Sequence, residues 1–358
     1  MAQLPVSTAV QNKKVILEEF TGITCTYCPD GHKRANILAA ANPGNVFVVN
    51  IHTGGYAGNN PDYKTPFGAA IASQSNITGY PAGTVNRTVF PGLSQNSSNP
   101  GTAMSRGNWT NAANQVMAQQ SYLNVALQAT LDTNTRELVV NVEVYYTGAS
   151  PAATNFLHVA LLQDSILGPQ TGGSTYYPAM MVNGQYQHNK MLRHLLTGQW
   201  GDQITTTSSG TLVSKQYTYT VPTHLPLVTI GTNTSVLLKK LRLVAFVTES
   251  TQTVVSGNAG PINLTPLSVE EQPNNFMFNV YPNPSYNSAT ISLNLEKSEK
   301  VNVSVVNMLG AEVYSYDDKL VQGMHYIPLD GSTLSEGIYN VRVEIGEVVM
   351  NRKLTLVK

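Results

Sequence analysis

The chain has 358 residues, which by the usual domain size is enough for two or three domains. Hydrophobic residues make up 42%, enough for packed cores, whereas charged residues make up only 12%, about half the share usual in soluble proteins. The 21 Lys and Arg balance the 21 Asp and Glu, so no basic surplus favours nucleic acid or an anionic membrane surface. No apolar run approaches the ~20 residues of a transmembrane segment.

The two cysteines, Cys25 and Cys28, are three residues apart, and the sequence has no others. This count excludes a framework of several disulfides and a site of four thiolates. A bare C-x-x-C binds metal only with a second pair of ligands, and no histidine pair at ligand spacing lies nearby. We therefore expect no metal and no cofactor.

The N-terminal residues 1–5 have neither the basic stretch nor the apolar stretch of a signal peptide. The protein is therefore expected either to be cytosolic or to be exported after removal of a signal peptide. The low charge and the many Asn, Thr and Tyr residues favour export.

The first part of the chain mixes strand and helix patterns. Apolar runs at 15–20 and 46–51 predict buried strands, and a helix is expected between them from Pro29 to about Ala41. This strand, helix, strand order implies a crossover connection and a parallel pair of strands. The further elements expected are a short helix near 66–75, strands near 83–90 and a helix over 108–120.

From about residue 122 the hydrophobic period changes to two. Alternation over 123–131 and 138–146 predicts a hairpin with one buried face, and later runs continue it, which favours an antiparallel β-sandwich. Residues 164–205 interrupt the pattern with a loop rich in Gly, Tyr and Gln and a possible short helix at 189–196. The final segment, 276–358, is about twice as charged and predicts six or seven short strands of a small immunoglobulin-like sandwich. A linker is expected at 270–275.

The position of the C-x-x-C between a buried strand and a helix favours redox chemistry. At a helix N-terminus, free backbone N–H groups and the macrodipole favour a thiolate over a thiol. Such a thiolate can attack a substrate disulfide, and the second thiol can resolve the mixed disulfide that forms.

Three features in order carry a resemblance to the thioredoxin superfamily over residues 13–120. They are the strand Val15–Phe20, the segment Cys25-Thr26-Tyr27-Cys28-Pro29 and the loop Gly79-Tyr80-Pro81. The resemblance implies an α/β thioredoxin-like fold with Cys25 as nucleophile and Cys28 as resolving thiol. It also implies that Glu19, six residues before Cys25, is a buried proton acceptor.

The same resemblance assigns the Gly79-Tyr80-Pro81 loop to substrate binding. Pro81 would follow a cis peptide bond and face the disulfide, and Tyr80 would offer backbone groups to an extended peptide. The sequence departs from the family in having Thr24 where a Trp usually stands and a long Gly/Asn-rich insertion at 53–65. Two simpler interpretations stay open: the cysteine pair is a permanent structural disulfide, and Glu19 is a solvated edge residue.

The final segment carries several motifs in a fixed order. They are Val280-Tyr281-Pro282-Asn283-Pro284, Asn307-Met308-Leu309-Gly310, the run from Leu334 to Val343, and the closing Lys353-Leu354-Thr355-Leu356-Val357-Lys358. With these, residues 276–358 closely resemble the type A C-terminal sorting domain of cargo of the Bacteroidetes type IX secretion system. The resemblance implies that this segment engages the secretion machinery, and that the protein is anchored at the surface or released. A signal peptide would then have been removed, with the mature sequence starting near Ala2-Gln3.

The segment 185–201 resembles part of a Bacteroidetes outer-membrane protein family that joins a thioredoxin-like domain to a β-sandwich, over about 13–265. Its His188 and His194 have neither i,i+3 nor i,i+4 spacing, so a structural or interdomain role is expected. The aromatic residues of the region could line a ligand or partner surface, or pack the loop onto the sandwich. They are Tyr176, Tyr177, Tyr186 and Trp200.

The sequence therefore predicts three domains: a thioredoxin-like domain at 13–120, a β-sandwich at 121–268 with the insertion at 164–205, and a sorting domain at 276–358. The expected function is thiol–disulfide exchange on extended peptide substrates by an exported surface or secreted protein. The alternative is a non-enzymatic surface binding or adhesion protein in which the Cys25–Cys28 disulfide is structural.

Overall fold

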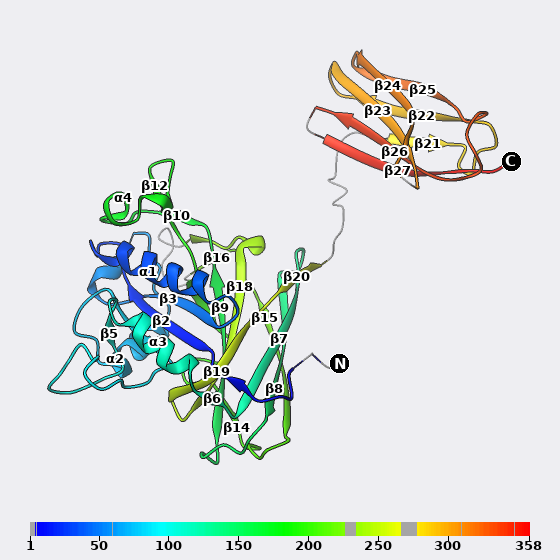
Figure 1. The fold of residues 1–358 in the computed structure, drawn as a ribbon. Coiled ribbons are helices and arrows are strands. Elements are labelled where there is room, and N and C mark those ends of the chain that lie inside the picture. The colour runs from blue at the N-terminus through cyan, green and yellow to red at the C-terminus, as the bar shows by residue number, and fades with distance from the viewer. Residues whose placement is uncertain are drawn as a thin grey trace. The chain divides into compact units, whose positions relative to one another are not determined.

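The computed structural model describes residues 4, 6–58, 60–225, 234–265, 278–308, 310–346 and 348–358. The chain folds into two compact units, Met1–Leu267 and Ser268–Lys358 (Figure 1). The expected start of the mature sequence at Ala2-Gln3 and the expected linker at 270–275 lie outside the described residues.

One large sheet organises the first unit. Within the described residues the order of its strands is β19-β18-β9-β13-β3-β2-β4-β5. In addition, β14 pairs with the first three residues of β9, 155–157. The bounds are β2 Val15–Thr21, β3 Val46–His52, β4 Ala82–Val85, β5 Met104–Ser105, β9 Asn155–Gln163, β13 Met191–Leu195, β14 Asp202–Ile204, β18 Leu241–Glu249 and β19 Gln252–Gly260. The strands come from both sides of residue 120, so the predicted N-terminal and middle domains share this sheet.

Strand β13 corrects one sequence-based expectation. The short helix predicted at 189–196 is wrong, because this segment is a strand that pairs parallel with β3 and antiparallel with β9. Met191, Leu192 and Leu195 are buried in it. A central position between two strands and burial of these side chains outweigh the helix propensity of Met and Leu. The strand joins the N-terminal part of the sheet to the middle part.

The predicted helices of the N-terminal part are present as α1 Cys28–Ala41, α2 Gly68–Ser75 and α3 Trp109–Met117. As predicted, β2 and β3 are parallel, with Val15 opposite Val46. Successive β2 side chains point to opposite faces of the sheet. Val15 and Leu17 pack with residues of α1 and α3, whereas Ile16 and Phe20 pack with residues of α2.

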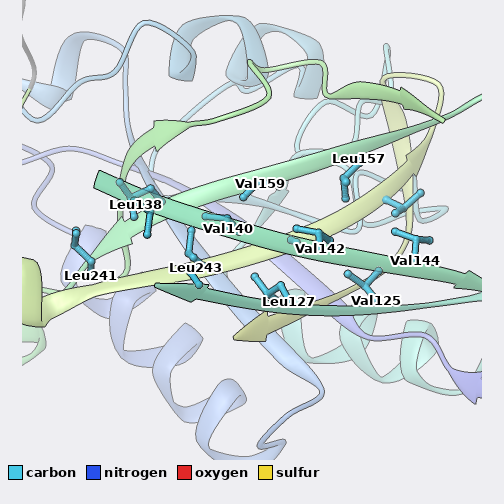
Figure 2. Close-up of a cluster of buried hydrophobic side chains, with 14 of the residues drawn as sticks. Val125, Leu127, Leu138, Val140, Val142, Val144, Leu157, Val159, Leu241 and Leu243 are labelled. Atoms are coloured by element: carbon cyan, nitrogen blue, oxygen red, sulfur yellow. The ribbon is translucent and has the colours of Figure 1, made fainter. Parts of the chain in front are cut away.

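A second sheet covers the middle part of the large sheet. It has the order β15-β8-β7-β20, with the bounds β7 Leu123–Asp132, β8 Glu137–Tyr146, β15 Leu212–Thr220 and β20 Ile262–Thr265. The predicted hairpin is the β7–β8 pair, with Leu131 opposite Leu138. Figure 2 shows Leu127 of β7, Val140 of β8 and Leu243 of β18 in the buried cluster that holds the two sheets together. The hydrophobic alternation of these strands thus forms a sandwich core.

The predicted insertion at 164–205 holds a small sheet of its own. It has the order β10-β12-β11, with the bounds β10 Ile166–Gly168, β11 Met181–Val182 and β12 Gln185–His188, and it carries the short helix α4 Gly173–Tyr176. Shorter elements complete the first unit: β1 Gln11–Asn12 with β6 Gln120–Ser121, β16 His224–Leu225 with β17 Thr234–Ser235, η1 Gly55–Ala57, η2 Pro178–Met180 and η3 Leu238–Lys240.

The second unit is a sandwich of two antiparallel sheets, as predicted. In its described part the sheets are β21-β22-β25 and β24-β23-β26-β27. The bounds are β21 Phe278–Tyr281, β22 Ser288–Leu295, β23 Glu299–Asn307, β24 Glu312–Leu320, β25 Gly323–Asp330, β26 Gly337–Ile345 and β27 Val348–Leu356. Residues such as Ile291, Val303 and Val341 are fully buried between them. Among the helices that the structure describes in either unit, none has the length and apolar character needed to cross a membrane.

Candidate functional site

The two cysteines form a disulfide in the turn that connects β2 to α1. The turn is held by the Cys25 amide, which donates to the Gly22 carbonyl at 3.1 Å, and by the Cys28 amide, which donates to the Cys25 carbonyl at 3.3 Å. Helix α1 begins at Cys28 with Pro29 in its first turn, where the missing N–H of proline costs no helical hydrogen bond. The free N–H groups there would stabilise a thiolate formed when the disulfide opens.

Glu19 lies in the middle of β2, on the face that α1 covers, and its side chain is fully buried. Neither carboxyl oxygen has a hydrogen-bond partner among the described residues. Burial raises the pKa of this carboxyl well above its usual range, although the charges of Lys190 and Arg106 act against that shift. The solvated-edge interpretation of Glu19 is therefore wrong, since the carboxyl is a buried group that holds its proton unusually tightly.

The Tyr80–Pro81 peptide bond is cis, as predicted. It lies directly before β4, which pairs antiparallel with β2 so that Gly83 is opposite Glu19. A Cβ built on Gly31 in α1 would lie 2.4 Å from Glu19 Oε1 and 3.0 Å from Pro81 Cβ. Glu19 and Pro81 therefore meet against the first turns of α1, and only a glycine leaves them room.

Tyr80 points away from this meeting point, toward the loop at 54–56. A Cβ on Gly54 would lie 2.2 Å from the Tyr80 hydroxyl, and the rings of Tyr80 and Tyr56 are 5.6 Å apart. Burial raises the pKa of Tyr80. Tyr56 also accepts hydrogen bonds at its carbonyl from Thr24, at 3.0 Å from both the amide and the hydroxyl. The loop at 53–65 thus forms one wall beside the disulfide turn.

The opposite wall comes from the insertion, which the sequence did not assign to this site. The Gln170 side chain donates to the carbonyls of Gly22 and Cys25, both at 3.1 Å, and the Thr171 amide donates to Ile23 at 2.8 Å. Tyr176 of α4 packs against Tyr27, with ring centroids 5.2 Å apart. With both walls in place, the side chains of Cys25 and Cys28 are only 3% and 0% exposed.

Three histidines lie buried behind the disulfide turn: His32 in α1, His52 at the end of β3 and His188 in β12. The His188 ring is 5.4 Å from the His52 ring and 6.4 Å from the His32 ring. Burial lowers the pKa of His32 to about 3 and that of His188 to about 4, and it also lowers the pKa of His52. Within the described part of the chain, no group of three or more His, Cys, Asp or Glu is arranged to hold a metal ion.

From the sequence, His188 and His194 were singled out, whereas His32 and His52 were not. His188 belongs to the buried cluster, whereas His194 stacks on Tyr219 with ring centroids 4.3 Å apart. His32 follows Cys28 by four residues on a predicted helix, and that spacing places both on one helix face. The spacing could have identified His32, but no local pattern marks His52, which reaches the cluster through the order of the sheet.

We expect Glu19→Gln to stabilise the folded chain at neutral pH. In the unfolded chain Glu19 has an ordinary pKa near 4.5, whereas in the folded chain the pKa is raised, so folding becomes less favourable as pH rises from about 4.5. Glutamine has the same shape and no charge, so it avoids this cost. Urea unfolding of both proteins from pH 4 to 8 checks this. The stability difference should vanish near pH 4 and grow with pH, and a difference independent of pH would contradict the assignment.

Two protein-family models match the chain and define the class of the protein. Residues 279–357 match the model of the secretion system C-terminal sorting domain. Residues 69–261 match the model of outer membrane protein Omp28. The protein is therefore exported to the cell surface or the extracellular space, and its C-terminal unit is the part that the secretion machinery handles.

The Omp28 match covers more than half of the chain, and the chain belongs to the Omp28 outer membrane protein family. The matched region begins at residue 69, after Glu19 and both cysteines, so family membership does not by itself describe the disulfide site. No curated protein matches the chain.

Two solved structures from Porphyromonas gingivalis are similar. HBP35 is 18% identical with a TM-score of 0.52, and the similarity covers 97% of this chain and 99% of that one, which indicates a shared fold. A domain of the outer membrane lipoprotein Omp28 is 22% identical, covers 41% of this chain and 92% of that one, and has a TM-score of 0.27. The second similarity is too partial to bear on the fold.

Proposed function

We propose that this Omp28-family protein exchanges thiols and disulfides on extended peptides outside the cell, through Cys25 and Cys28 on a thioredoxin-like scaffold. One observation carries the proposal: the unpartnered, fully buried Glu19 carboxyl lies against the helix that begins at Cys28. A buried acid without a partner is costly to keep for structure alone. At the first turns of the helix that begins at Cys28, such an acid would supply and accept the proton that exchange requires.

The proposed reaction oxidises a dithiol peptide. A substrate thiolate attacks Cys25 Sγ, the bond between Cys25 and Cys28 breaks, and Cys28 leaves as a thiolate that takes the proton of Glu19. The second substrate thiol loses its proton to solvent and attacks the mixed disulfide, which releases the oxidised peptide and the Cys25 thiolate. Two electrons pass from the substrate dithiol to the cysteine pair. In the reverse direction, the reduced pair opens a substrate disulfide.

Pro81 and Tyr80 are proposed to receive the peptide beside the disulfide. The walls formed by the 53–65 loop and by Gln170 to Tyr176 would then restrict which peptides reach Cys25. Residues outside the proposed thioredoxin-like domain at 13–120 would thus form part of its peptide-binding site.

Cys28→Ser is expected to trap the mixed disulfide, because the chain then has a nucleophilic Cys25 but no resolving thiol. The reduced variant is mixed with a peptide that contains one disulfide, and the adduct is measured by intact mass. The matched variant Cys25→Ser keeps only the fully buried Cys28 and should form at least about tenfold less adduct. Equal amounts of adduct from both variants would show that Cys25 is not the preferred nucleophile. Oxidation of a dithiol peptide by the wild-type chain, lost in Cys25→Ser, tests the exchange itself.

The burial of the cysteines favours a second function, that of a surface binding protein with a structural disulfide. Both sulfur-bearing side chains are almost inaccessible, and the Gln170 side chain holds the turn from outside. If this alternative holds, the wild-type chain should not oxidise the dithiol peptide. Cys25→Ser should then leave the binding of a partner unchanged.

A further inference from the structure

His32 is held from two sides in the first turns of α1. Its Nδ1 is 2.9 Å from the Tyr186 hydroxyl, and its Nε2 is 2.9 Å from the Thr21 hydroxyl. Tyr186 belongs to β12 of the insertion, whereas Thr21 is the last residue of β2. The ring therefore joins the inserted segment to the strand that carries Glu19, and two hydrogen bonds fix its orientation.

The same ring is next to the unpartnered acid. His32 Nε2 is 4.0 Å from Glu19 Oε1. Thr21 follows Glu19 by two residues on β2, so the two side chains are on one face of the sheet. Both lie under α1, and the edge of the His32 ring that carries Nε2 is directed toward both of them.

The hydrogen bond between Tyr186 and Nδ1 of His32 is linked to which ring nitrogen carries the proton, since the hydroxyl can donate to Nδ1 only when Nδ1 is unprotonated. Neutral histidine has one donor and one acceptor nitrogen. When the Tyr186 hydroxyl donates to Nδ1, the proton is on Nε2 and points toward Thr21 and Glu19. An N–H in this position favours an ionised carboxylate at Glu19. Without the Tyr186 hydroxyl, the proton can move to Nδ1, and this support for the carboxylate is lost.

Other charged and titratable groups also face Glu19. From α1 comes Asp30, which forms ion pairs with Arg34 and Arg106. From the turn before β13 comes Lys190, whose ammonium group donates a hydrogen bond to the Asn36 side chain. Tyr186 and His188 face His32 from β12. Among the described residues, none of these groups lies within hydrogen-bond distance of the Glu19 oxygens. His32, with Nε2 4.0 Å from Glu19 Oε1, is therefore the described side chain best placed to act on them.

We propose that His32 is a positioning residue that controls release of the Glu19 proton, and that Tyr186 of the insertion holds His32 in the tautomer this requires. The inference rests on the proposed function, because the Glu19 proton matters only where the cysteine pair opens. It makes the insertion at 164–205 a part of the proposed redox site.

The proton balance follows from the exchange step. When Cys28 leaves as a thiolate, it takes the proton of Glu19 and leaves a carboxylate, which the Nε2–H of His32 stabilises. When Cys28 re-forms the disulfide as a nucleophile, the carboxylate takes the proton back. His32 stays neutral and neither gains nor loses a proton overall.

The test is the pH profile of disulfide opening in the full chain. Oxidised protein is reduced with dithiothreitol between pH 5 and 9, and the rate is divided by the thiolate fraction of the reagent. The wild-type profile should show one inflection that Glu19→Gln removes. Tyr186→Phe removes one hydroxyl and should move the inflection to higher pH. The shift should be less than the ~0.7 unit of a full hydrogen bond, because Nε2 of His32 is 4.0 Å from Glu19 Oε1. His32→Leu should move the inflection in the same direction.

The matched control is Tyr146→Phe, which removes an equally buried hydroxyl bonded to Asn155 at 2.9 Å in the sandwich core. It should leave the inflection in place. If Tyr186→Phe, which keeps the shape of the side chain, leaves the inflection unmoved, His32 does not act through Tyr186. A wild-type profile with no inflection would show that the Glu19 proton, and therefore His32, does not affect disulfide opening. Both results overturn this inference whether or not the dithiol peptide is oxidised. Loss of peptide oxidation, with the shifts as expected, would overturn only the proposed function.

Discussion

Lowering the pH from 7 to 5 should reduce the free energy of unfolding of the first unit by several kcal/mol. His32 and His188 are buried with pKa values of about 3 and about 4, whereas the ordinary pKa of a histidine, as in the unfolded chain, is 6.5. As pH falls below 6.5 the unfolded chain takes up protons that the folded chain refuses, so folding stability is lost. At pH 5 each of the two residues accounts for about 2 kcal/mol.

Other buried groups change the size of this acid effect but not its direction. His52 and His158 are fully buried with lowered pKa values, so they add to the loss. Glu19 acts in the opposite sense, because its raised pKa makes folding more favourable as pH falls toward 4.5. Partial burial also lowers the pKa of His194. Five histidines against one carboxyl leave a net loss of stability in acid.

The chain provides a clean readout for this prediction. Its two tryptophans, Trp109 and Trp200, are both in the first unit, so their fluorescence in urea follows that unit alone. His188→Gln should reduce the acid loss at pH 5 by about 2 kcal/mol. His224→Gln changes an exposed histidine and should leave the loss unchanged. Equal stability of the wild type at pH 7 and pH 5 would contradict the neutral buried state of these rings.

Arg87→Met should destabilise the first unit by about 3–5 kcal/mol. Glu18 and Arg87 are 3% and 2% exposed, and two hydrogen bonds of 2.7 Å join the guanidinium to both carboxylate oxygens. Arg87 also donates to the Thr251 carbonyl at 3.3 Å and thus ties β2 to the turn between β18 and β19. Removing the cation leaves a buried carboxylate without a partner, which is among the most costly single changes.

Two comparisons separate the cost of the unpaired charge from the loss of packing. The double variant Glu18→Gln and Arg87→Met removes both charges and should recover most of the lost stability. Arg242→Met breaks the pair between the exposed Arg242 and the partly buried Asp164, and it should cost less than about 1 kcal/mol because the cation is in water. Urea unfolding monitored by tryptophan fluorescence measures all three. A double variant as unstable as Arg87→Met would show that the pair matters through packing instead.

Local patterns predicted much of the fold. The period-two alternation from Leu123 to Tyr146 gave the β7–β8 hairpin, and the run at 15–20 followed by Pro29 gave β2 and α1. The strand β13 could not be predicted from its own residues, because Met191 to Leu195 favour a helix in isolation. It is a strand because β3 and β9 flank it, and that pairing depends on residues about 140 positions earlier and about 30 earlier.

The residues of the candidate site that lie close together in the sequence could be predicted. Those that reach the site from distant parts of the chain could not. Cys25 and Cys28 stand out by their spacing along one segment, whereas Glu19 and the cis bond before Pro81 followed from the resemblance to a family. Gln170 and Tyr186 contact the site from about 150 residues away. Nothing in a Gly/Tyr-rich loop indicates which turn it will cover, so the second wall of the site needed the structure.

The position of β13 has a consequence for dividing this protein into parts. A fragment cut to residues 69–261, the range of the Omp28 match, would lack β2 and β3. The edge of β13 that now pairs with β3 would be open, and β4 would lose its partner β2. Open edges of this kind recruit strands from other chains. The cysteine segment and the sandwich therefore have to be produced and purified in one chain.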